Sequence, residues 1–348
     1  MDGAMKLARQ FWFEQGQTQR IHFVARRQSW HGTTIGALSM SSNLPRKIPY
    51  QPLLIPNISY VSPAFAYHYQ DPAESESAYV ARLAAELDAE FQRLGPSNVI
   101  AFVAEPVVGA TSGCTPAPTG YFKAIRQICD RYRILFILDE VMCGVGRTGT
   151  FFAFEQEDVV PDIMTIGKGL GGGYAPIAAV LVHNKIIAVL RNGAGGFNHG
   201  HTYQAHPLTC AIALSVQQIL KRDHLVERCK EMGQLLETYL RRDLEGCKYV
   251  GDIRGRGLFW AVEFVRDRET KESFDPSVRF GLKVQLRALE FGVAVYPGAA
   301  TVDGVRGDHV VVAPPYTVTW VQLRDITRAA RAAYDVEEAG FDRLEAKM

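Results

Sequence analysis

The feature that most constrains the fold is a series of short apolar runs separated by amphipathic helical patterns. Each run is apolar almost throughout, as expected for parallel strands in a sheet that helices cover on both faces. The runs are RIHFVAR (20–26), NVIAFVAEP (98–106), RILFILDEV (133–141), DIMTIGK (162–168) and IAAVLV (177–182). Helical patterns occupy residues 75–95 and 120–133 between them. This alternation predicts an α/β fold with a mainly parallel central sheet flanked by helices.

The pattern changes after about residue 205. One long helical pattern covers residues 207–244. Three strand-like runs and a terminal helical pattern follow it, the runs being GLFWAVEFV (257–265), GVAVYP (292–297) and DHVVVAPP (308–315). We therefore expect a large α/β domain over residues 1–214 and a smaller C-terminal α+β domain over residues 215–348.

The first residues, MDGAMKLARQFW, form an amphipathic helical pattern with Met1, Met5, Ala8 and Trp12 on one face. No Ser, Thr, Asp or Asn precedes this pattern as an N-cap, because the chain begins inside it. This beginning indicates that the start of a larger protein is missing. The segment also lacks the basic region and apolar core of a secretory signal.

Charge and cysteine usage narrow the class of protein. The formal net charge is +1, which argues against nucleic acid or an anionic membrane as the main partner. No run reaches the roughly 18 apolar residues that a membrane span needs. The six cysteines are scattered without a CxxC pair, which suits free thiols in a reducing compartment. We expect an intracellular, cytoplasmic protein.

Three chemically useful side chains follow predicted strands: Glu105, Asp139 and Lys168. Singly, such a carboxylate is more often a turn or cap residue and such a lysine a surface charge, but the carboxyl ends of strands in one sheet converge. Pyridoxal phosphate needs a lysine amine for covalent attachment and a carboxylate against its pyridine nitrogen. The glycines around Lys168, in GKGLGGG (167–173), let the backbone approach a cofactor. The three side chains therefore favour a pyridoxal-phosphate site.

Other short motifs are weaker. GVGRTG (144–149) matches the dinucleotide-binding glycine pattern, but Asp139 and Glu140 stand where the strand-to-helix turn should be and no convincing helix follows. The lysine of GKG is not followed by the Ser or Thr of a nucleotide-binding P-loop. A group of three histidines lacks a fourth zinc ligand, so we expect no metal there; these are His199, His201 and His206.

The stretch FILDEVMCGVGRTGTFFAFEQEDVVPDIMTIGKGLGGGYAPIAAVLV (136–182) resembles the cofactor signature of class III pyridoxal-phosphate aminotransferases. These are fold-type I enzymes and include ornithine, 4-aminobutyrate and ω-amino acid transaminases. Further matching segments occur in the family's order: SWHGTT (29–34), AEPVVGATSG (104–113), HGHTYQAHPL (199–208), GDIRGRGLFWAVEF (251–264) and VVVAPPYTVT (310–319). The resemblance implies an enzyme that moves an amino group from an amine or amino acid to a keto acid or aldehyde by a ping-pong mechanism.

The resemblance also implies roles for individual residues. Lys168 is similar to the lysine that forms a Schiff base with pyridoxal 5'-phosphate, and Asp139 to the partner of its pyridinium nitrogen. Val141 and Trp30 would pack on opposite faces of the ring. Glu105 would lie near the side of the ring that carries the hydroxyl.

Thr202 is similar to the hydroxyl residue that reaches the phosphate of the neighbouring subunit's cofactor. The resemblance therefore implies a homodimer with shared active sites.

The chain departs from the family at three places. The "GSEA"-type loop whose backbone amides bind the phosphate would precede Met1. Ala110 stands where ornithine- and 4-aminobutyrate-type members have a glutamate, and Val311 where they have the arginine that this glutamate gates. Arg306 is a candidate substitute for that arginine, as in ω-transaminase-like members.

These departures leave two alternatives to transamination. The first is an aminomutase, decarboxylase or racemase on the same scaffold. The second is a catalytically inactive, truncated fragment that lacks the phosphate-binding loop.

Overall fold

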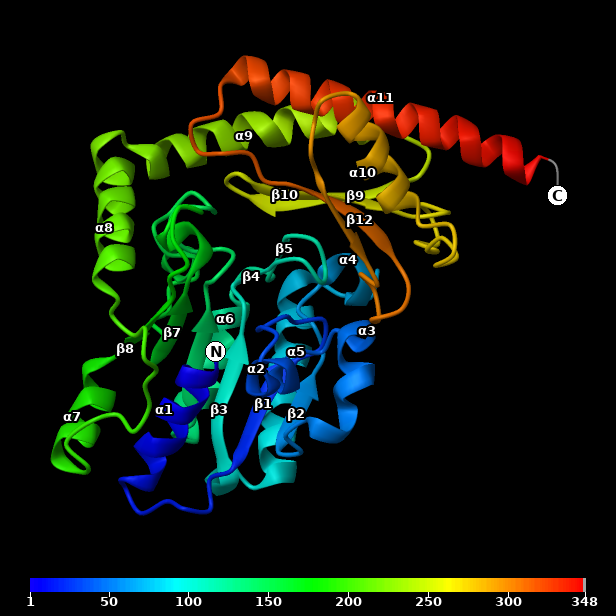
Figure 1. Ribbon diagram of the computed structural model, residues 1–348. Coiled ribbons are helices and arrows are strands. Elements are labelled where there is room, and N and C mark those ends of the chain that lie inside the picture. Colours follow the sequence, from blue (N-terminus) through cyan, green and yellow to red (C-terminus); the bar gives the residue numbers. More distant parts are fainter. Residues whose placement is uncertain (347–348) are drawn as a thin grey trace.

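The computed structural model describes residues 1–346 of the 348-residue chain. It contains a six-stranded sheet in the order β2-β1-β3-β6-β7-β8 and a four-stranded sheet in the order β11-β12-β10-β9. Figure 1 shows the smaller sheet above the carboxyl-terminal end of the larger one, with helices around both. A short two-stranded ribbon of β4 (Val107–Val108) and β5 (Thr115–Pro116) lies between them. The predicted α/β class is confirmed.

The six-stranded sheet is mainly parallel, as predicted. Its strands are β1 (His22–Arg26), β2 (Ile58–Val61), β3 (Val99–Ala104), β6 (Leu135–Asp139), β7 (Ile163–Ile166) and β8 (Ala179–Val182). All neighbouring pairs are parallel except β7 and β8, which are antiparallel. The edge strand β2 has no predicted counterpart, because its sequence ISYV is half polar and only partly buried.

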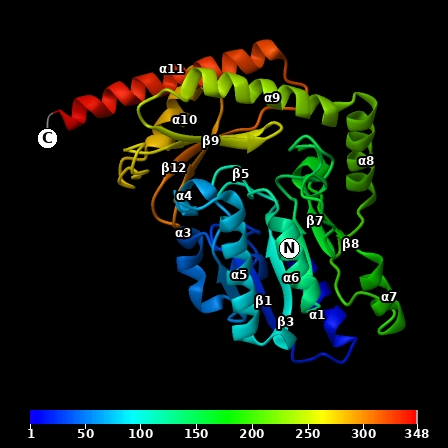
Figure 2. The ribbon, with the colours of Figure 1, turned by 180° about the vertical axis from the view of Figure 1, so that it is seen from behind.

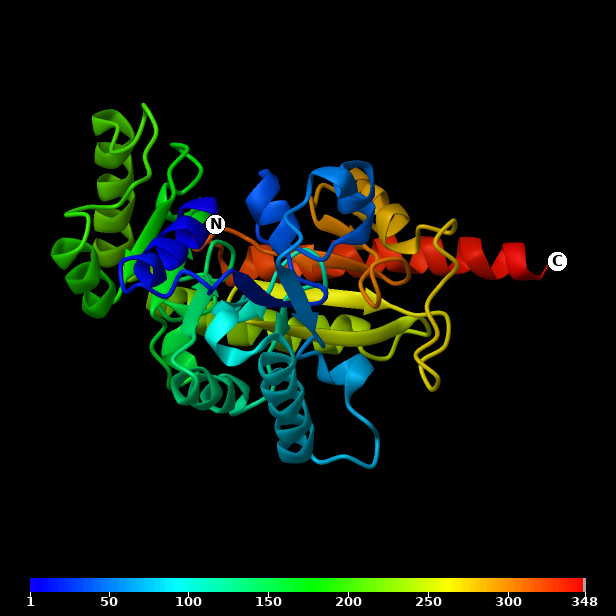
Figure 3. The same ribbon diagram turned by 90° about the horizontal axis from the view of Figure 1, so that it is seen from below.

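Helices cover both faces of this sheet (Figure 3). On one face lie α1 (Asp2–Phe13) and α7 (Asn184–Asn192), and on the other α5 (Glu76–Leu94) and α6 (Tyr121–Arg131). Leu135 and Ile137 of β6 pack towards α1, whereas Phe136 and Leu138 pack towards α5 and α6. Burial on both faces is why β6 is apolar at successive positions.

The N-terminal pattern forms α1, as predicted. Met5, Ala8 and Trp12 are buried against the sheet, and Met1 is half-buried. The Trp12 indole also donates a hydrogen bond from Nε1 to the carbonyl of Ile100 in β3 at 3.0 Å. The helix is thereby fixed to the centre of the sheet.

The second sheet is antiparallel and separates two cores. Its strands are β9 (Val250–Arg256), β10 (Phe259–Phe264), β11 (Tyr296–Ala299) and β12 (Asp308–Val312). Three helices cover its outer face: α9 (Leu225–Leu244), α10 (Phe280–Glu290) and α11 (Trp320–Glu345). Phe259 and Ala261 on the inner face pack against Val107, Cys114 and Cys143, which follow strands of the first sheet.

Three details differ from, or lie outside, the sequence predictions. The pattern over residues 207–244 forms two helices, α8 (Pro207–Arg222) and α9, because His224 takes a left-handed conformation with φ 48°. Figure 2 shows that these helices run in different directions. The predicted strand 292–297 is largely a connection after α10, and β11 begins only at Tyr296. The domain boundary expected at residue 214 falls within α8 and stays a prediction.

The remaining elements are short. They are α2 (Ile35–Met40), α3 (Leu44–Lys47) and α4 (Ala66–Tyr69), with 3-10 turns η1 (Ile48–Leu53), η2 (Pro96–Asn98), η3 (Ala153–Gln156) and η4 (Lys168–Leu170). Within residues 1–346, the helices are too short or too polar to cross a membrane.

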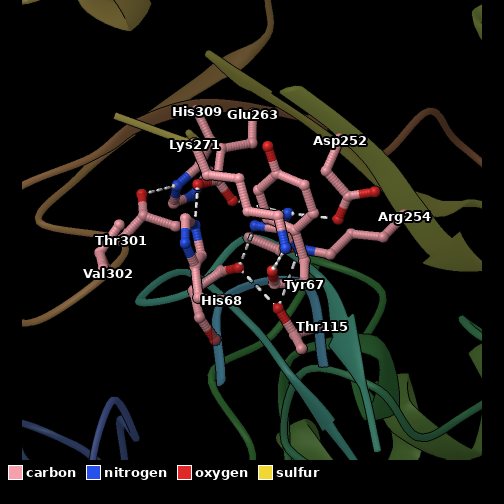
Figure 4. Close-up of polar contacts among 12 residues, drawn as sticks. Tyr67, His68, Thr115, Asp252, Arg254, Glu263, Lys271, Thr301, Val302 and His309 are labelled. Carbon is pink, nitrogen blue, oxygen red and sulfur yellow. Dashed lines mark hydrogen bonds and ion pairs between the residues drawn. The ribbon is translucent and has the colours of Figure 1, made fainter. Parts of the chain in front are cut away.

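A buried polar network joins the second sheet to α4 and to the loop between β4 and β5 (Figure 4). Arg254 of β9 donates to the carbonyl groups of Ser112 and Gly113 at 2.6 and 2.8 Å. The same guanidinium forms an ion pair with Glu263 of β10 at 2.7 Å, and His68 of α4 contacts the other oxygen of Glu263. The network therefore fixes the loop after β3 beneath the second sheet.

Candidate active site

The ends of β3, β6 and β7 bring the three predicted side chains to one edge of the sheet. These strands are adjacent and parallel, and Glu105 and Lys168 follow the carboxyl ends of β3 and β7 while Asp139 is the last residue of β6. Asp139 lies opposite Thr165 in the register of β6 and β7, and Lys168 comes three residues after Thr165. A Cβ atom at Gly167 would lie 3.5 Å from Val141 Cγ1, so Val141 also lies beside this turn.

Asp139 is 4% exposed and receives three hydrogen bonds. Its Oδ2 lies 2.8 Å from His31 Nδ1, while Oδ1 accepts from Thr165 Oγ1 at 3.0 Å and from the Val141 amide at 3.1 Å. Burial raises the pKa of Asp139, but the hydrogen bond and charge of His31 and the Val141 N–H lower it by more. The net pKa lies below the ordinary value, so the carboxylate is held ionised.

His31 and Thr165 are site residues that the sequence reasoning missed. His31 is fully positioned by the chain, because its backbone amide donates to Ser41 Oγ at 2.7 Å and its Nδ1 contacts Asp139. Its other ring nitrogen, Nε2, is buried and has no hydrogen-bond partner within residues 1–346. In the sequence, the only indication of a role for His31 is its position beside Trp30 in SWHG. Thr165 is marked only by its position within a predicted strand.

Glu105 joins the turn after β1 to the loop after β3. Its Oε1 accepts from the Trp30 amide and its Oε2 from the Gly109 amide, both at 3.0 Å. Burial and the charge of Asp139 raise the pKa of this carboxyl, and the charge of His31 and the two amides lower it by less, so the net pKa lies above the ordinary value. Glu105 thus fixes the backbone of Trp30, whose half-buried indole lies under the Arg46 guanidinium at 4.4 Å.

Lys168 stands apart from the other charges. Its side chain is exposed and makes no hydrogen bond or ion pair with the described residues. Its φ is 42°, a left-handed conformation that is costly for a residue with a side chain and is concentrated at functional sites. The glycines are sterically required nearby, because a Cβ at Gly171 would overlap the carbonyl of Ala175. The turn therefore holds a free amine at the strand end.

Two predicted residues are not joined to this cluster within one chain. Thr202 is exposed in the segment between α7 and α8 and makes no hydrogen bond with the described residues. Arg306 forms an ion pair from Nε to Asp303 Oδ2 at 2.7 Å, and Asp303 also accepts from the Arg306 amide. Both roles stay predictions.

The dinucleotide-binding motif does not form its expected structure. Residues 144–149 lie in consecutive turns, and the next helical element is the 3-10 turn η3 where a dinucleotide site needs an α-helix. Within the described part of the chain, no three His, Cys, Asp or Glu side chains could hold a metal ion together. A hollow of about 1000 Å³ beside α8 and α9 contains none of the predicted site residues.

Comparison with known proteins identifies the family. The family model described as aminotransferase class-III matches residues 1–333. The chain belongs to the class III aminotransferases. An uncharacterised aminotransferase of Schizosaccharomyces pombe is 50% identical over 330 residues, which are 94% of this chain and 72% of the relative. The chain thus spans about seven tenths of that relative's length.

Other relatives are more distant. A chloroplastic gamma-aminobutyrate transaminase of Solanum lycopersicum is 33% identical over 92% of this chain and 61% of its own length. The crystal structure of an (S)-enantioselective ω-transaminase from Thermomicrobium roseum is 35% identical, with a TM-score of 0.89 over 97% of this chain and 72% of that one. The fold-type I architecture predicted from the sequence is therefore confirmed.

Class III aminotransferases use pyridoxal phosphate, and the residues at the strand ends fit this cofactor. A carboxylate has about four acceptor positions; Asp139 uses three within the chain and can accept a pyridinium N–H with the fourth. The Lys168 amine is free for covalent attachment. The unpartnered Nε2 of His31 is a further buried polar atom that the described residues do not satisfy.

Proposed function

We propose that the chain is a transaminase that moves an amino group from an amine or amino acid to a keto acid or aldehyde by a ping-pong mechanism. One observation carries the proposal: a buried, ionised carboxylate, Asp139, and a free amine, Lys168, lie at the ends of adjacent parallel strands. The gamma-aminobutyrate and ω-transaminase names of relatives support the same reaction class.

Each residue has a distinct task in this proposal. When bound, pyridoxal phosphate would supply an aldehyde that accepts the amino group and an electron-poor ring that stabilises negative charge on the donor carbon. Lys168 would hold the cofactor covalently, and its Nζ, when free, would take the proton from the donor carbon. Asp139 keeps the pyridine nitrogen protonated. Trp30 and Val141 would pack on opposite faces of the cofactor ring, and Glu105 fixes the Trp30 backbone.

The proposed enzyme is a homodimer with shared active sites. Exposed apolar side chains support a second copy as the partner: Tyr203, Leu208 and Leu214, in and just before α8, and Tyr174, in the loop after η4, are each more than half exposed. Thr202 is exposed and adjoins Tyr203 in the chain, and in this proposal it reaches the cofactor phosphate of the partner subunit.

Light scattering tests the dimer. We expect twice the chain mass for the wild type and a monomer for Leu214→Glu, because a charge placed in an apolar interface is costly. Leu344→Glu, at an equally exposed leucine near the end of α11, is the matched control. A monomeric wild type, or a dimer insensitive to Leu214→Glu, would contradict the assignment.

Cofactor attachment and product analysis test the reaction. Pyridoxal phosphate added to the wild type should give a visible absorbance band, and borohydride reduction should add the cofactor's mass to the peptide that contains Lys168. Lys168→Ala should abolish both signals. The reacted donor should yield its carbonyl product in equal amount to the aminated acceptor. A racemised, rearranged or decarboxylated donor without amino transfer would replace transamination by one of the alternatives, and no attachment would identify an inactive fragment.

A further inference from the structure

The turn that carries Lys168 packs against a second turn, which follows β6 and contains Val145. Val145 is buried, and a Cβ atom at Gly169, the residue after Lys168, would lie 3.3 Å from the Cβ of Val145. This separation is shorter than in most contacts between side chains, so the backbone of the lysine turn lies almost directly on Val145. The position of Val145 therefore helps to set the position of Lys168.

The backbone of Val145 has an unfavourable conformation. Its φ is 54°, in the left-handed region that a β-branched residue seldom adopts. Lys168 is left-handed as well, with φ 42°. Such conformations are costly and persist only where the surrounding structure holds them. The turn at Val145 therefore needs a contact that fixes it.

Tyr316 provides this contact from the other sheet. It lies in the turn between β12 and α11, 171 residues from Val145 in the chain, and donates a hydrogen bond from Oη to the carbonyl of Val145 at 2.8 Å. The same hydroxyl oxygen would lie 3.8 Å from a Cβ atom at Gly169. The hydroxyl of Tyr316 therefore lies where the two turns meet.

Tyr316 is itself held in place. The guanidinium of Arg147 lies over its ring at 4.5 Å, and Nη1 of Arg147 donates to the carbonyls of Leu258 and Pro314 at 3.0 and 2.7 Å. Burial raises the pKa of Tyr316 to about 12, so its hydroxyl keeps its proton at neutral pH and can donate it to a carbonyl. The hydrogen bond to Val145 thus comes from a fixed, protonated donor.

We propose that Tyr316 is a positioning residue for Lys168. By holding the carbonyl of Val145, its hydroxyl fixes the surface on which the lysine turn rests, and so the direction of the Lys168 amine. The catalytic part of this inference rests on the transaminase function proposed above. It gives the segment after β12 a role in the placement of the lysine.

Hydrogen exchange of the cofactor-free protein tests the positioning directly. Tyr316→Phe removes only the hydroxyl. The amides of Leu170 and Gly171 donate to the carbonyls of Gly167 and Lys168 within the turn, and they should exchange about 3- to 10-fold faster in the variant, as expected when one neutral hydrogen bond is lost. Exchange in β3 should not change.

Tyr79→Phe is the matched control. Tyr79 in α5 is also buried, and its hydroxyl donates to the carbonyl of Pro63 at 3.1 Å. Its replacement should lower the urea unfolding midpoint at least as much as Tyr316→Phe does, but should leave exchange in the lysine turn unchanged. Faster exchange of this turn in both variants, or in neither, would overturn the proposal.

Gly169→Ala tests the same contact from its other side. The added methyl group lies against Val145, so the turn or its support must shift, and exchange of the turn should again be faster. In Tyr316→Phe/Gly169→Ala the increase should be smaller than the product of the two single increases, because both changes disturb one contact. Effects that multiply independently would show that Tyr316 does not act through Val145.

The loaded enzyme gives a third measurement. In Tyr316→Phe, kcat should fall about 3- to 10-fold while KM for the amine donor stays within about twofold, because the lysine rather than the donor is displaced. The rate at which pyridoxal phosphate attaches, followed by the visible absorbance band, should fall by a similar factor, and Tyr79→Phe should leave both rates unchanged. A loss confined to KM, or an unchanged attachment rate, would overturn the positioning role. If the wild type neither attaches the cofactor nor transfers an amino group while the exchange results hold, only the transaminase function is overturned.

Discussion

His31 donates a hydrogen bond from Nδ1 to Asp139 Oδ2 at 2.8 Å, and both side chains are buried. An ionised carboxylate can only accept, so Nδ1 carries the proton. His31→Phe leaves a buried carboxylate without this donor, and its pKa should rise because burial is no longer offset. We expect kcat/KM to fall about 10- to 100-fold, as for other lost hydrogen bonds to charge.

The pH profile distinguishes this positioning role from a loss of folding. A carboxyl with a lowered folded pKa contributes stability above its ordinary pKa of 3.8 and loses it as the pH falls through the folded value. In His31→Phe the raised folded pKa should move the acidic limb of kcat/KM to a higher pH. It should also reduce the loss of stability in acid, so the urea unfolding midpoint should fall less between pH 5 and pH 3 than it does in the wild type. His31→Asn, which places an amide N–H near the position of Nδ1, should restore most of the profile. An unchanged acidic limb in His31→Phe would exclude the role.

Thr165 provides the second side-chain contact to Asp139, from Oγ1 to Oδ1 at 3.0 Å. Thr165→Val keeps the shape of the side chain but removes this donor. We expect a loss of about 10- to 100-fold in kcat/KM, since a hydrogen bond to a charged group contributes about 1.5–3 kcal/mol. Thr165→Ser keeps the hydroxyl and should stay within about twofold. Equal rates for the valine and serine variants would show that the contact is dispensable.

Asp139 and Lys168 could be predicted because each follows an apolar run, and strand ends in a parallel sheet meet at one edge. Thr165 could not, because its role depends on which residue of β7 lies opposite Asp139, and the apolar runs do not encode that register. His31 could not, because its contact joins segments 108 residues apart in the chain.

The sequence pattern does not predict the helix break at His224, for a different reason. The apolar pattern continues through it, and only a left-handed backbone at a non-glycine residue separates α8 from α9. The absence of an ion-pair partner for Arg46 within residues 1–346 likewise depends on its neighbours in space. Arg306, by contrast, forms an ion pair with Asp303. Sequence patterns locate strand ends well, whereas pairings across the fold require the packed structure.

Arg254 should be critical for stability because Glu263 is fully buried beside it. Arg254→Met leaves Glu263 with only His68 as an ionic partner, which should lower the free energy of unfolding by about 3–5 kcal/mol. Replacing both members, in Arg254→Met/Glu263→Leu, should cost less than the single change, because the fully buried carboxylate of Glu263 is then removed and only the partly exposed Asp252 loses its ion-pair partner. Urea unfolding of both variants measures the difference in the free energy of unfolding. A double variant that is less stable than the single variant would contradict the prediction.

Glu140 should give the protein a pH-dependent stability. It is buried and accepts from the amides of Ala153 and Phe154 at 2.7 and 2.8 Å, and burial raises its pKa to about 7. Because the folded pKa is raised above the ordinary 4.5, the contribution is full below pH 4.5 and is lost as the pH rises towards 7. The glutamine side chain in Glu140→Gln does not titrate. The free energy of unfolding of the wild type, relative to that of the variant, should therefore be about 2 kcal/mol higher at pH 5 than at pH 8. An equal gap at both values would exclude the titration of Glu140.

Gly298 of β11 should tolerate no side chain, because a Cβ there would overlap Nε2 of the buried His309. The imidazole cannot easily turn aside, since its Nδ1 lies 2.6 Å from Thr301 Oγ1. Gly298→Ala should therefore lower the free energy of unfolding by about 1–3 kcal/mol, the usual cost of overpacking. Gly340→Ala in α11 is the opposite control: nothing lies within 4 Å of its Cβ position, and alanine in a helix should add about 0.5–1 kcal/mol. Urea unfolding measures both variants; equal stability changes would show that His309 yields to the added methyl group.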